Sequence, residues 1–351
     1  MPSETISCLI EADYDQVSKK MRRAAYLRAL YPPAGVRYKI AVGKSYPGKI
    51  SHYSADPISI FLAAIRFLAE PLSSNKRDAD VQHIFFWKRG RKDIPAVMEN
   101  DQSLSQFLSD YIKVRGGLKE KMRSMFLSIS RANKVRAIIV WSEWAKKGFE
   151  KDGFPEDTIK VIPPPVAVNN YTKNYDSQRI LFVGRDFKRK GGDIALRAFI
   201  NIAKKFDKAE LFYVGKVDDD ELLKIAMKTG RVKHYQNPSD EMLYNRIFPE
   251  SDIFLLPSRS EAFGISIVEA MSYSLPVIVS DLPSIRENVI NGYNGIVVDD
   301  EEAYEEALSA LLEDRRKRKS MGLNGLEIVK NRFAPEKIGQ ELKKVYVDAL
   351  G

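Results

Sequence analysis

Two glutamates eight positions apart, Glu261 and Glu269, flank Gly264 in the most informative stretch of the chain. An apolar run over residues 252–257 leads into a polar loop, and Gly264 then turns the chain into a predicted helix. Each carboxylate can accept a pair of hydroxyl groups, and the backbone N–H groups at a helix start can hold an anion. This pattern suits a ligand that carries both several hydroxyl groups and phosphate.

Two cations precede these acids in the sequence. Arg185 and Lys190 follow a short apolar run at residues 180–183. Arginine offers phosphate oxygens a planar fork of donors, and lysine offers a mobile point charge. Arg185 and Glu261 each follow a predicted strand of one parallel sheet, so we expect both at the same edge of that sheet.

Strands alternate with helices through the second half of the chain. The predicted strands cover residues 180–183, 209–214, 231–235, 253–256 and 277–279. The predicted helices include residues 194–206, residues 221–228 and a segment that Ser239 caps and that runs to residue 248. This alternation indicates parallel βαβ units, and therefore an α/β domain.

The first half is also α/β in pattern but less regular. Its predicted strands cover residues 6–10, 38–42, 81–87, 95–98 and 136–140, with helical runs at residues 18–30 and 104–130. A chain of 351 residues is long enough for two domains with separate cores. Three consecutive prolines at residues 163–165 favour a stiff, extended connector, so we place the domain boundary there.

The cysteine content and the apolar segments of the chain indicate its cellular compartment. The chain has one cysteine, Cys8, which excludes an internal disulfide and a zinc site built from cysteines. The first ten residues lack the pattern of a secretory signal, and the longest apolar stretch, residues 58–65, is too short to span a bilayer. We therefore expect a cytoplasmic protein.

The basic excess lies entirely in the first half. Residues 1–165 contain 28 Lys and Arg against 18 Asp and Glu, whereas the whole chain has a net charge of +9. Three interpretations stay open. Basic helices at residues 19–28 and 113–136 could contact the inner face of an anionic membrane. Alternatively, the positive charge attracts a soluble anionic acceptor, or it is an ordinary solvated surface. No nucleic-acid-binding motif accompanies the charge, so we expect no nucleic-acid partner.

These motifs together resemble the retaining glycosyltransferases of family 4, which have the GT-B architecture. The resemblance covers roughly residues 135–350 and rests on Glu261 and Glu269 as a Glu-x7-Glu element. Val183-Gly-Arg185 with Lys190-Gly191 is similar to the family's phosphate element, and residues 287–295 fit its usual continuation. The resemblance implies two facing Rossmann-like domains with a cleft between them.

The resemblance also implies domain bounds and residue roles. Residues 1–165 would form the acceptor-side domain, residues 166–335 the donor domain, and residues 336–351 a helix that crosses back to the first domain. Glu261, Arg185 and Lys190 would be catalytic. Glu269 would bind the ribose of a nucleotide-diphosphate sugar, and the other donor-binding residues would be Gly184, Phe263, Gly264 and Ile265.

Retention in this family is usually explained by attack on the face from which the phosphate leaves, with that phosphate helping to deprotonate the acceptor. We therefore expect no dedicated enzymic base. We also expect neither a metal nor another cofactor, because GT-B enzymes generally transfer without one. The acidic residues 218–220 are better explained as a loop and helix N-terminus than as metal ligands.

The first domain departs from the family. Where relatives usually have a glycine-rich loop, residues 11–15 contain no glycine. Asn100, followed by Asp101, stands where many relatives have histidine, and His83 matches another position that is often histidine. These three residues are our candidate contacts on the acceptor and sugar side. The alternatives are a loop cap for Asn100 and Asp101, and a structural role for His83.

Two other functions remain consistent with this altered first domain. One is a GT-B epimerase that acts on a sugar nucleotide, and the other is a non-catalytic subunit that binds nucleotide sugar. The sequence specifies neither the base nor the sugar of the donor. It is consistent with an acceptor that is lipid-linked or anionic.

Overall fold

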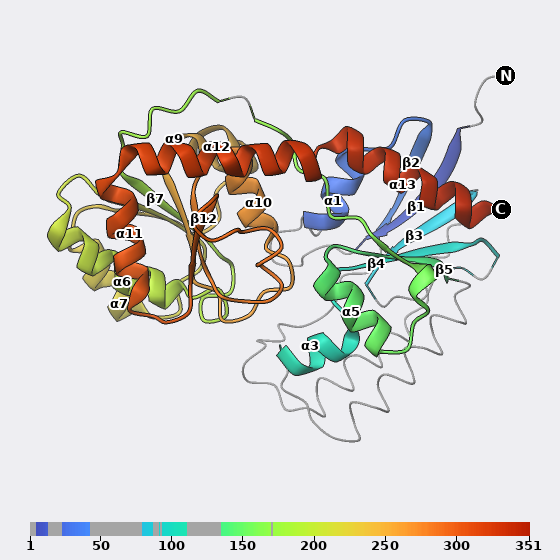
Figure 1. Cartoon of the computed structure of the whole chain (residues 1–351), viewed down its shortest axis with the longest axis horizontal. Coiled ribbons are helices and arrows are strands. Elements are labelled where there is room, and N and C mark those ends of the chain that lie inside the picture. Colours follow the sequence, from blue (N-terminus) through green and yellow to red (C-terminus); the bar gives the residue numbers. More distant parts are fainter. Residues whose placement is uncertain are drawn as a thin grey trace. The chain divides into compact units, whose positions relative to one another are not determined.

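The computed structural model divides the chain into two compact units (Figure 1). Unit 1 comprises Met1–Pro165 and Pro335–Gly351, and unit 2 comprises Val166–Ala334. The structure describes residues 5–12, 23–42, 79–86, 91, 93–110, 135–169 and 171–351. Each unit contains a six-stranded parallel sheet with helices packed against it, which confirms the predicted α/β class.

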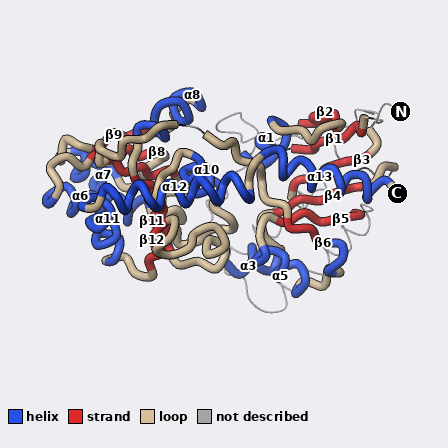
Figure 2. Tube along the Cα trace, turned by 45° about the horizontal axis from the view of Figure 1, so that its top comes forward, coloured by secondary structure: helices blue, strands red, loops and turns tan. Residues whose placement is uncertain are grey.

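The sheet of unit 1 has the strand order β2-β1-β3-β4-β5-β6 (Figure 2). Its strands are β1 Ile6–Ala12, β2 Val36–Val42, β3 Val81–Phe85, β4 Ala96–Asn100, β5 Val135–Val140 and β6 Ile159–Val161. The α-helices described in this unit before the C-terminal segment are α1 Arg23–Leu30, α3 Leu104–Asp110 and α5 Glu143–Lys151. The sequence predicted the first five strands but not β6, which is only three residues long.

The remaining parts of the predicted helical runs 18–30 and 104–130 lie outside the described residues. The same holds for residues 19–22 and 113–134 of the two basic segments, and for residues 13–15 of the segment that lacks glycine.

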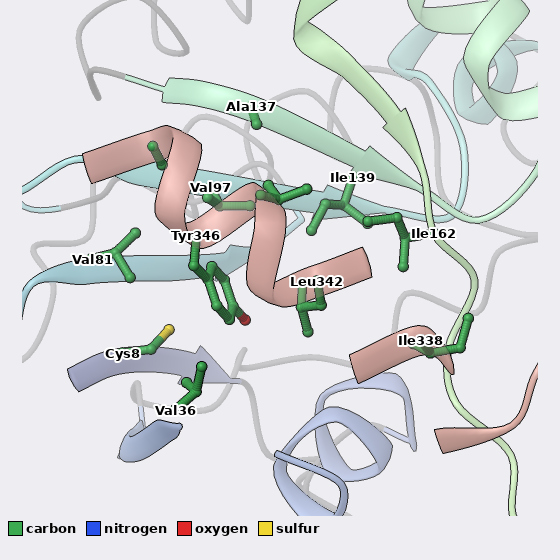
Figure 3. Packing of buried hydrophobic residues seen from close by; sticks show 12 residues of the cluster. Cys8, Val36, Val81, Val97, Ala137, Ile139, Ile162, Ile338, Leu342 and Tyr346 are labelled. Atoms are coloured by element: carbon green, nitrogen blue, oxygen red, sulfur yellow. The ribbon is translucent and has the colours of Figure 1, made fainter. Parts of the chain in front are cut away.

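The C-terminal helix α13 (Pro335–Leu350) belongs to unit 1 and covers its sheet. Its apolar side chains recur every three or four positions, which places them on one face of the helix. Figure 3 shows Ile338, Leu342 and Tyr346 from this face packed with Val81 and Val97 of the sheet. Burial of each large aliphatic side chain contributes about 1.5–3 kcal/mol. This face therefore holds the end of the chain on the first unit.

The sheet of unit 2 has the strand order β12-β11-β10-β7-β8-β9. Its strands are β7 Arg179–Val183, β8 Glu210–Val214, β9 Val232–Tyr235, β10 Ile253–Leu256, β11 Val277–Ser280 and β12 Gly295–Val298. Its longer helices are α6 Gly192–Lys205, α7 Asp220–Met227, α10 Ile265–Ser272, α11 Ala303–Glu313 and α12 Arg315–Arg332. The five predicted strands are confirmed, and β12 is an additional strand that the sequence analysis missed.

Two local expectations have different outcomes. Asp219 caps α7 by accepting from the Leu222 N–H at 2.9 Å, so the acidic residues 218–220 do form a loop and helix start. Ser239 also acts as the predicted cap and accepts from the Met242 N–H at 3.1 Å.

The helix that follows Ser239 is not regular, however, because a π-helical turn, Leu243–Ile247, separates α8 (Asp240–Met242) from α9 (Phe248–Glu250). Pro249 has no N–H to donate to the preceding turn, which interrupts the α-helical ladder.

Candidate functional site

One loop carries the candidate cations Arg185 and Lys190, a second loop carries Glu261, and both leave the same edge of the unit 2 sheet. Strand β7 ends at Val183 and β10 ends at Leu256, and the two strands are parallel neighbours. The loops that follow them touch, because the Arg259 N–H donates to the Arg189 carbonyl at 2.7 Å. Parallel pairing thus brings together segments that are about 70 residues apart in sequence.

Lys190 and Glu261 form an ion pair at this edge. Lys190 Nζ donates to Glu261 Oε2, and the two side chains are only 15% and 10% exposed. Burial raises the pKa of the Glu261 carboxyl, but the attraction of Lys190 and Arg189 outweighs it and holds that pKa below its usual value. Burial lowers the pKa of the Lys190 ammonium, against the pull of Glu261. Glu261 is therefore ionised at neutral pH and has a nearby cation.

Helix α10 starts directly beside this pair. Gly264 is its N-cap and has φ = +79°, a left-handed conformation that glycine adopts without steric cost. The Phe263 ring is buried against Phe333, and its carbonyl accepts from Asn288 Nδ2 at 3.0 Å. Ile265 is the first helical residue. The predicted donor-binding residues Phe263, Gly264 and Ile265 therefore form a helix start held in place by its own packing.

Glu269 lies in the second turn of α10 and is buried, with 6% of its surface exposed. Its Oε1 accepts a hydrogen bond of 3.1 Å from the hydroxyl of Tyr244. The Tyr273 hydroxyl donates in turn to the Tyr244 carbonyl at 2.7 Å. Glu269 is thus a buried, oriented carboxylate rather than a solvated helix residue.

Tyr244 is a site residue that the sequence analysis missed. It lies in the π-helical turn Leu243–Ile247, and its ring stacks on Phe248 with 5.6 Å between ring centres. The available signal was its place in a helical segment that precedes β10. A tyrosine in such a segment is usually a packing residue, so the signal was weak.

Gly184 and Arg185 occupy the start of the first loop, which comprises residues 184–191 between β7 and α6. The Gly184 N–H donates to the Val214 carbonyl at 2.9 Å, which continues the β7–β8 ladder. Arg185 follows with an exposed side chain. The structure therefore joins Lys190 to Glu261 by direct contact and places Arg185 in the same loop, whereas Glu269 lies further along α10.

The unit 1 candidate His83 is fully buried in β3. Its Nε2 lies 2.8 Å from Glu99 Oε2, and its Nδ1 lies 2.6 Å from the Tyr346 hydroxyl. The ring also stacks on Phe85 with 4.7 Å between centres. Both ring nitrogens therefore face partners within unit 1, which favours the structural role over a ligand contact.

Asn100, by contrast, has unused hydrogen-bonding capacity. It ends β4 with 1% of its surface exposed, and among the residues that the structure describes neither atom of its amide group has a hydrogen-bond partner. The neighbouring Gln102 also has an unpartnered Oε1, and Asp101 between them is partly exposed. A buried amide without partners costs free energy. Within the described residues Asn100 therefore makes no capping hydrogen bond, and its contact with a sugar hydroxyl stays a prediction.

Unit 2 matches a known family model. The sequence model of the family described as glycosyl transferases group 1 matches residues 167–327. The match covers nearly all of unit 2, including both loops and α10.

Curated relatives carry names of the same kind. The capsular polysaccharide biosynthesis glycosyltransferase CapM of Staphylococcus aureus is 26% identical over 248 residues, which are 68% of this chain and 61% of that protein. A phosphatidyl-myo-inositol mannosyltransferase of Mycobacterium leprae is 32% identical over 173 residues, or 48% of this chain and 46% of that protein. The chain thus spans about half to three fifths of the length of these relatives.

Solved structures match almost the whole chain. Sucrose-phosphate synthase from Thermosynechococcus elongatus has a TM-score of 0.66 at 17% identity and covers 97% of this chain and 98% of its own. Anabaena Alr3699/HepE in complex with UDP and glucose has a TM-score of 0.66 at 15% identity, with the same coverage of both chains. The chain has the two-domain α/β fold of GT-B glycosyltransferases, as the resemblance implied.

Proposed function

We propose that this protein is a glycosyltransferase that moves a sugar from a nucleotide-diphosphate sugar to a hydroxyl group. The observation that carries the proposal is the buried Lys190–Glu261 pair beside the start of α10, with the oriented carboxylate Glu269 on the same helix. The names of the curated relatives support it. So do the neighbouring Anabaena HepE structures, which are complexes of that protein with UDP and with UDP-glucose.

Each residue has a role in this proposal that follows from its chemistry. Glu269 accepts hydrogen bonds from the ribose hydroxyls of the donor, because a buried carboxylate can accept two such donors at once. Lys190, Arg185 and the N–H groups at the start of α10 neutralise the diphosphate. Glu261 accepts from the sugar and holds Lys190 in place.

The reaction is proposed to be retaining, as in family 4. The acceptor oxygen forms a bond to the anomeric carbon on the face from which the diphosphate departs. The bond between that carbon and the phosphate oxygen breaks, and the leaving group takes both electrons. The acceptor proton passes to a phosphate oxygen, so the products are the glycoside and a nucleoside diphosphate. Lys190 and Arg185 stabilise the negative charge as it develops.

We propose that this step uses no resident metal or other cofactor. The proposal rests on the cations of unit 2, since Lys190 and Arg185 supply positive charge where a divalent ion would otherwise act. Transfer that continues unchanged after dialysis against EDTA is the expected result, and activity that returns only when magnesium or manganese is added would contradict it.

A panel of nucleotide sugars tests the proposed function. UDP-, GDP- and ADP-linked sugars are added to the protein, and the melting temperature is measured, since a ligand of the folded form raises it. Donors that bind are then incubated without acceptor, and the products are analysed. Slow release of free sugar and nucleoside diphosphate supports transfer, an isomeric sugar nucleotide indicates the epimerase, and binding without turnover indicates a non-catalytic subunit. If no donor in the panel raises the melting temperature, the proposal is wrong.

For the acceptor we propose an anionic molecule, either lipid-linked or soluble, that the basic first half of the chain attracts. In the part of the chain that the structure describes, no helix combines the length and apolarity needed to cross a bilayer. Flotation with vesicles of phosphatidylglycerol and phosphatidylcholine at low salt tests the lipid source. Co-flotation that high salt abolishes supports membrane contact, and failure to float favours a soluble anion.

A further inference from the structure

Asp193 is a buried carboxylate next to the candidate site that none of the proposed roles uses. It lies in the first turn of α6, and its side chain is 2% exposed. Arg259 donates to it from Nη1 at 2.7 Å and from Nη2 at 3.2 Å. Lys188 and Arg197 contact it at 3.1 and 2.8 Å. Burial raises the pKa of Asp193, but Arg259 and Lys188 outweigh it and lower that pKa to about 2, so Asp193 stays ionised.

Arg259 connects Asp193 to both loops of the site. It belongs to the second loop, which comprises residues 257–264 between β10 and α10, and it lies two residues before Glu261. Its Nη1 also donates to the Lys188 carbonyl of the first loop at 2.8 Å. Its backbone N–H donates to the Arg189 carbonyl at 2.7 Å. One residue of the second loop thus makes both main-chain and side-chain bonds to the first loop.

Arg189 makes the reciprocal connection. It belongs to the first loop, and its Nη1 donates to the Ser260 carbonyl at 3.1 Å. Arg259 and Arg189 therefore bond to each other's loops at positions directly next to Lys190 and Glu261. The short residue spacing leaves little freedom for Lys190 and Glu261 to separate while these bonds hold.

We propose that Arg259 and Asp193 are positioning residues that hold Lys190 against Glu261. This inference rests on the proposed function only for its consequence in donor binding. Arg259 approaches Asp193 with two nitrogens, and this forked geometry restricts rotation as well as distance. The first loop is thereby fixed to both α6 and the second loop. The cation that meets the diphosphate is thus placed before the donor arrives, which reduces the ordering cost of binding.

The first test does not depend on the function. The pKa of the Glu261 carboxyl is measured by carbon-13 NMR in the wild type and in Arg259→Ala, with Glu261→Gln to assign the signal. Release of the loops draws Lys190 and Arg189 away from Glu261, so its pKa rises in Arg259→Ala. Arg197→Ala is the matched control, because Arg197 contacts the same carboxylate from α6 itself and leaves the bonds between the loops intact.

The second test measures the consequence for the donor. Affinities for UDP and for uridine are compared in the wild type, Arg259→Ala, Arg259→Lys and Arg197→Ala, with GDP and guanosine, and ADP and adenosine, in parallel. The loss of a positioned charge–phosphate contact weakens nucleoside diphosphate binding about tenfold in Arg259→Ala. Nucleoside affinity stays unchanged, because Glu269 does not depend on the loops. A general loss of structure would weaken both ligands together.

Arg259→Lys distinguishes charge from geometry. It keeps the positive charge but not the forked contact, so we expect it to resemble Arg259→Ala in both measurements. If Arg259→Ala does not fold, Arg259→Lys and Asp193→Asn supply the same comparison. An unchanged Glu261 pKa in a folded Arg259→Ala, Arg259→Lys or Asp193→Asn variant overturns the positioning role. If no nucleoside diphosphate binds to the wild type while the Glu261 pKa rises, the proposed function fails and the positioning role stands.

Discussion

Lys190 and Glu261 compensate each other's charge in a largely buried place. Removing one member of a buried pair leaves the other charge without a partner, which costs more than the pair itself contributes. In the proposed function a bound diphosphate contacts Lys190 while the pair stays closed, because an ammonium group has three N–H donors and needs only one of them for Glu261. Both charges therefore keep a partner when the donor binds.

Replacing Lys190 by alanine tests this role. We expect Lys190→Ala to slow sugar transfer or donor hydrolysis by about a hundredfold or more, because stabilisation of the leaving diphosphate is lost. Steady-state kinetics with the donor that the panel identifies measures the effect. Lys208→Ala, at an exposed position in unit 2, is the control and should retain wild-type turnover. Normal turnover by Lys190→Ala would remove Lys190 from the mechanism.

Tyr244 has a smaller but specific predicted effect. Tyr244→Phe removes the hydroxyl that donates to Glu269, and we expect nucleoside diphosphate affinity to fall about three- to tenfold. Isothermal titration calorimetry measures the change. Tyr171→Phe is the matched control, since Tyr171 is 45% exposed and contributes its ring to a stack with Tyr273. Equal affinities for wild type and Tyr244→Phe would mean that the hydroxyl does not orient Glu269 for the ribose.

At the scale of elements, the close approach of the two loops depends on Gly191. It is the N-cap of α6 with φ = +69°, and a Cβ atom there would lie 1.8 Å from the Pro257 carbonyl oxygen. Gly230 has nearly the same conformation, φ = +70°, but a Cβ atom there would meet nothing within 4 Å. A comparison of Gly191 with Gly230 therefore separates the cost of the left-handed backbone conformation from the cost of steric crowding.

We therefore predict different stabilities for two alanine variants. Gly230→Ala should lower the free energy of unfolding by about 1–2 kcal/mol, the cost of the left-handed conformation alone. Gly191→Ala should cost clearly more, because the loops that carry Lys190 and Pro257 must move apart. Urea denaturation of both variants measures the difference. Equal losses in the two variants would show that the loops tolerate separation.

The strands of both sheets were largely predictable, since short runs of apolar and β-branched residues that alternate with helical segments favour buried strands. Strand β6 was not predicted because it has only three residues, whereas β12 was missed although it is as long as the predicted edge strand β9. The π-helical turn at Leu243–Ile247 was also missed. A local pattern specifies helix but does not distinguish the i→i+5 hydrogen bonds of a π-helical turn from those of an α-helix.

At the scale of the whole molecule, the C-terminal helix α13 completes the hydrophobic core of unit 1. Helix α13 buries Leu342 and Tyr346 on the sheet of unit 1, and Tyr346 also bonds to His83. His83 contacts Glu99, and Glu99 accepts from Arg28 at 2.9 Å in a fully buried ion pair. The attraction of Arg28 and His83 outweighs burial and lowers the pKa of Glu99. Unit 1 thus joins α1, its sheet and α13 through one polar cluster.

Two substitutions on α13 test this arrangement. Leu342→Ala should lower the free energy of unfolding by about 2–5 kcal/mol, because Leu342 is 1% exposed and leaves a cavity. Val347→Ala, at a position that is 50% exposed, is the control. Hydrogen exchange followed by mass spectrometry should show lost protection in β3 and β4 and unchanged protection in β7 and β10. Loss confined to unit 2 would contradict the assignment of α13 to the core of unit 1.

The sequence by itself determined the class of the fold, the two loops of unit 2 and the residue types at the candidate site, because these depend on local patterns and on motif spacing. Only the tertiary structure decided which groups touch: Lys190 with Glu261, Tyr244 with Glu269, and Arg259 with Asp193. It also decided that His83 is enclosed by Glu99 and Tyr346. The physical reason is that such contacts join residues far apart in the chain. Their partners follow from strand order and helix packing, which no local stretch of sequence specifies.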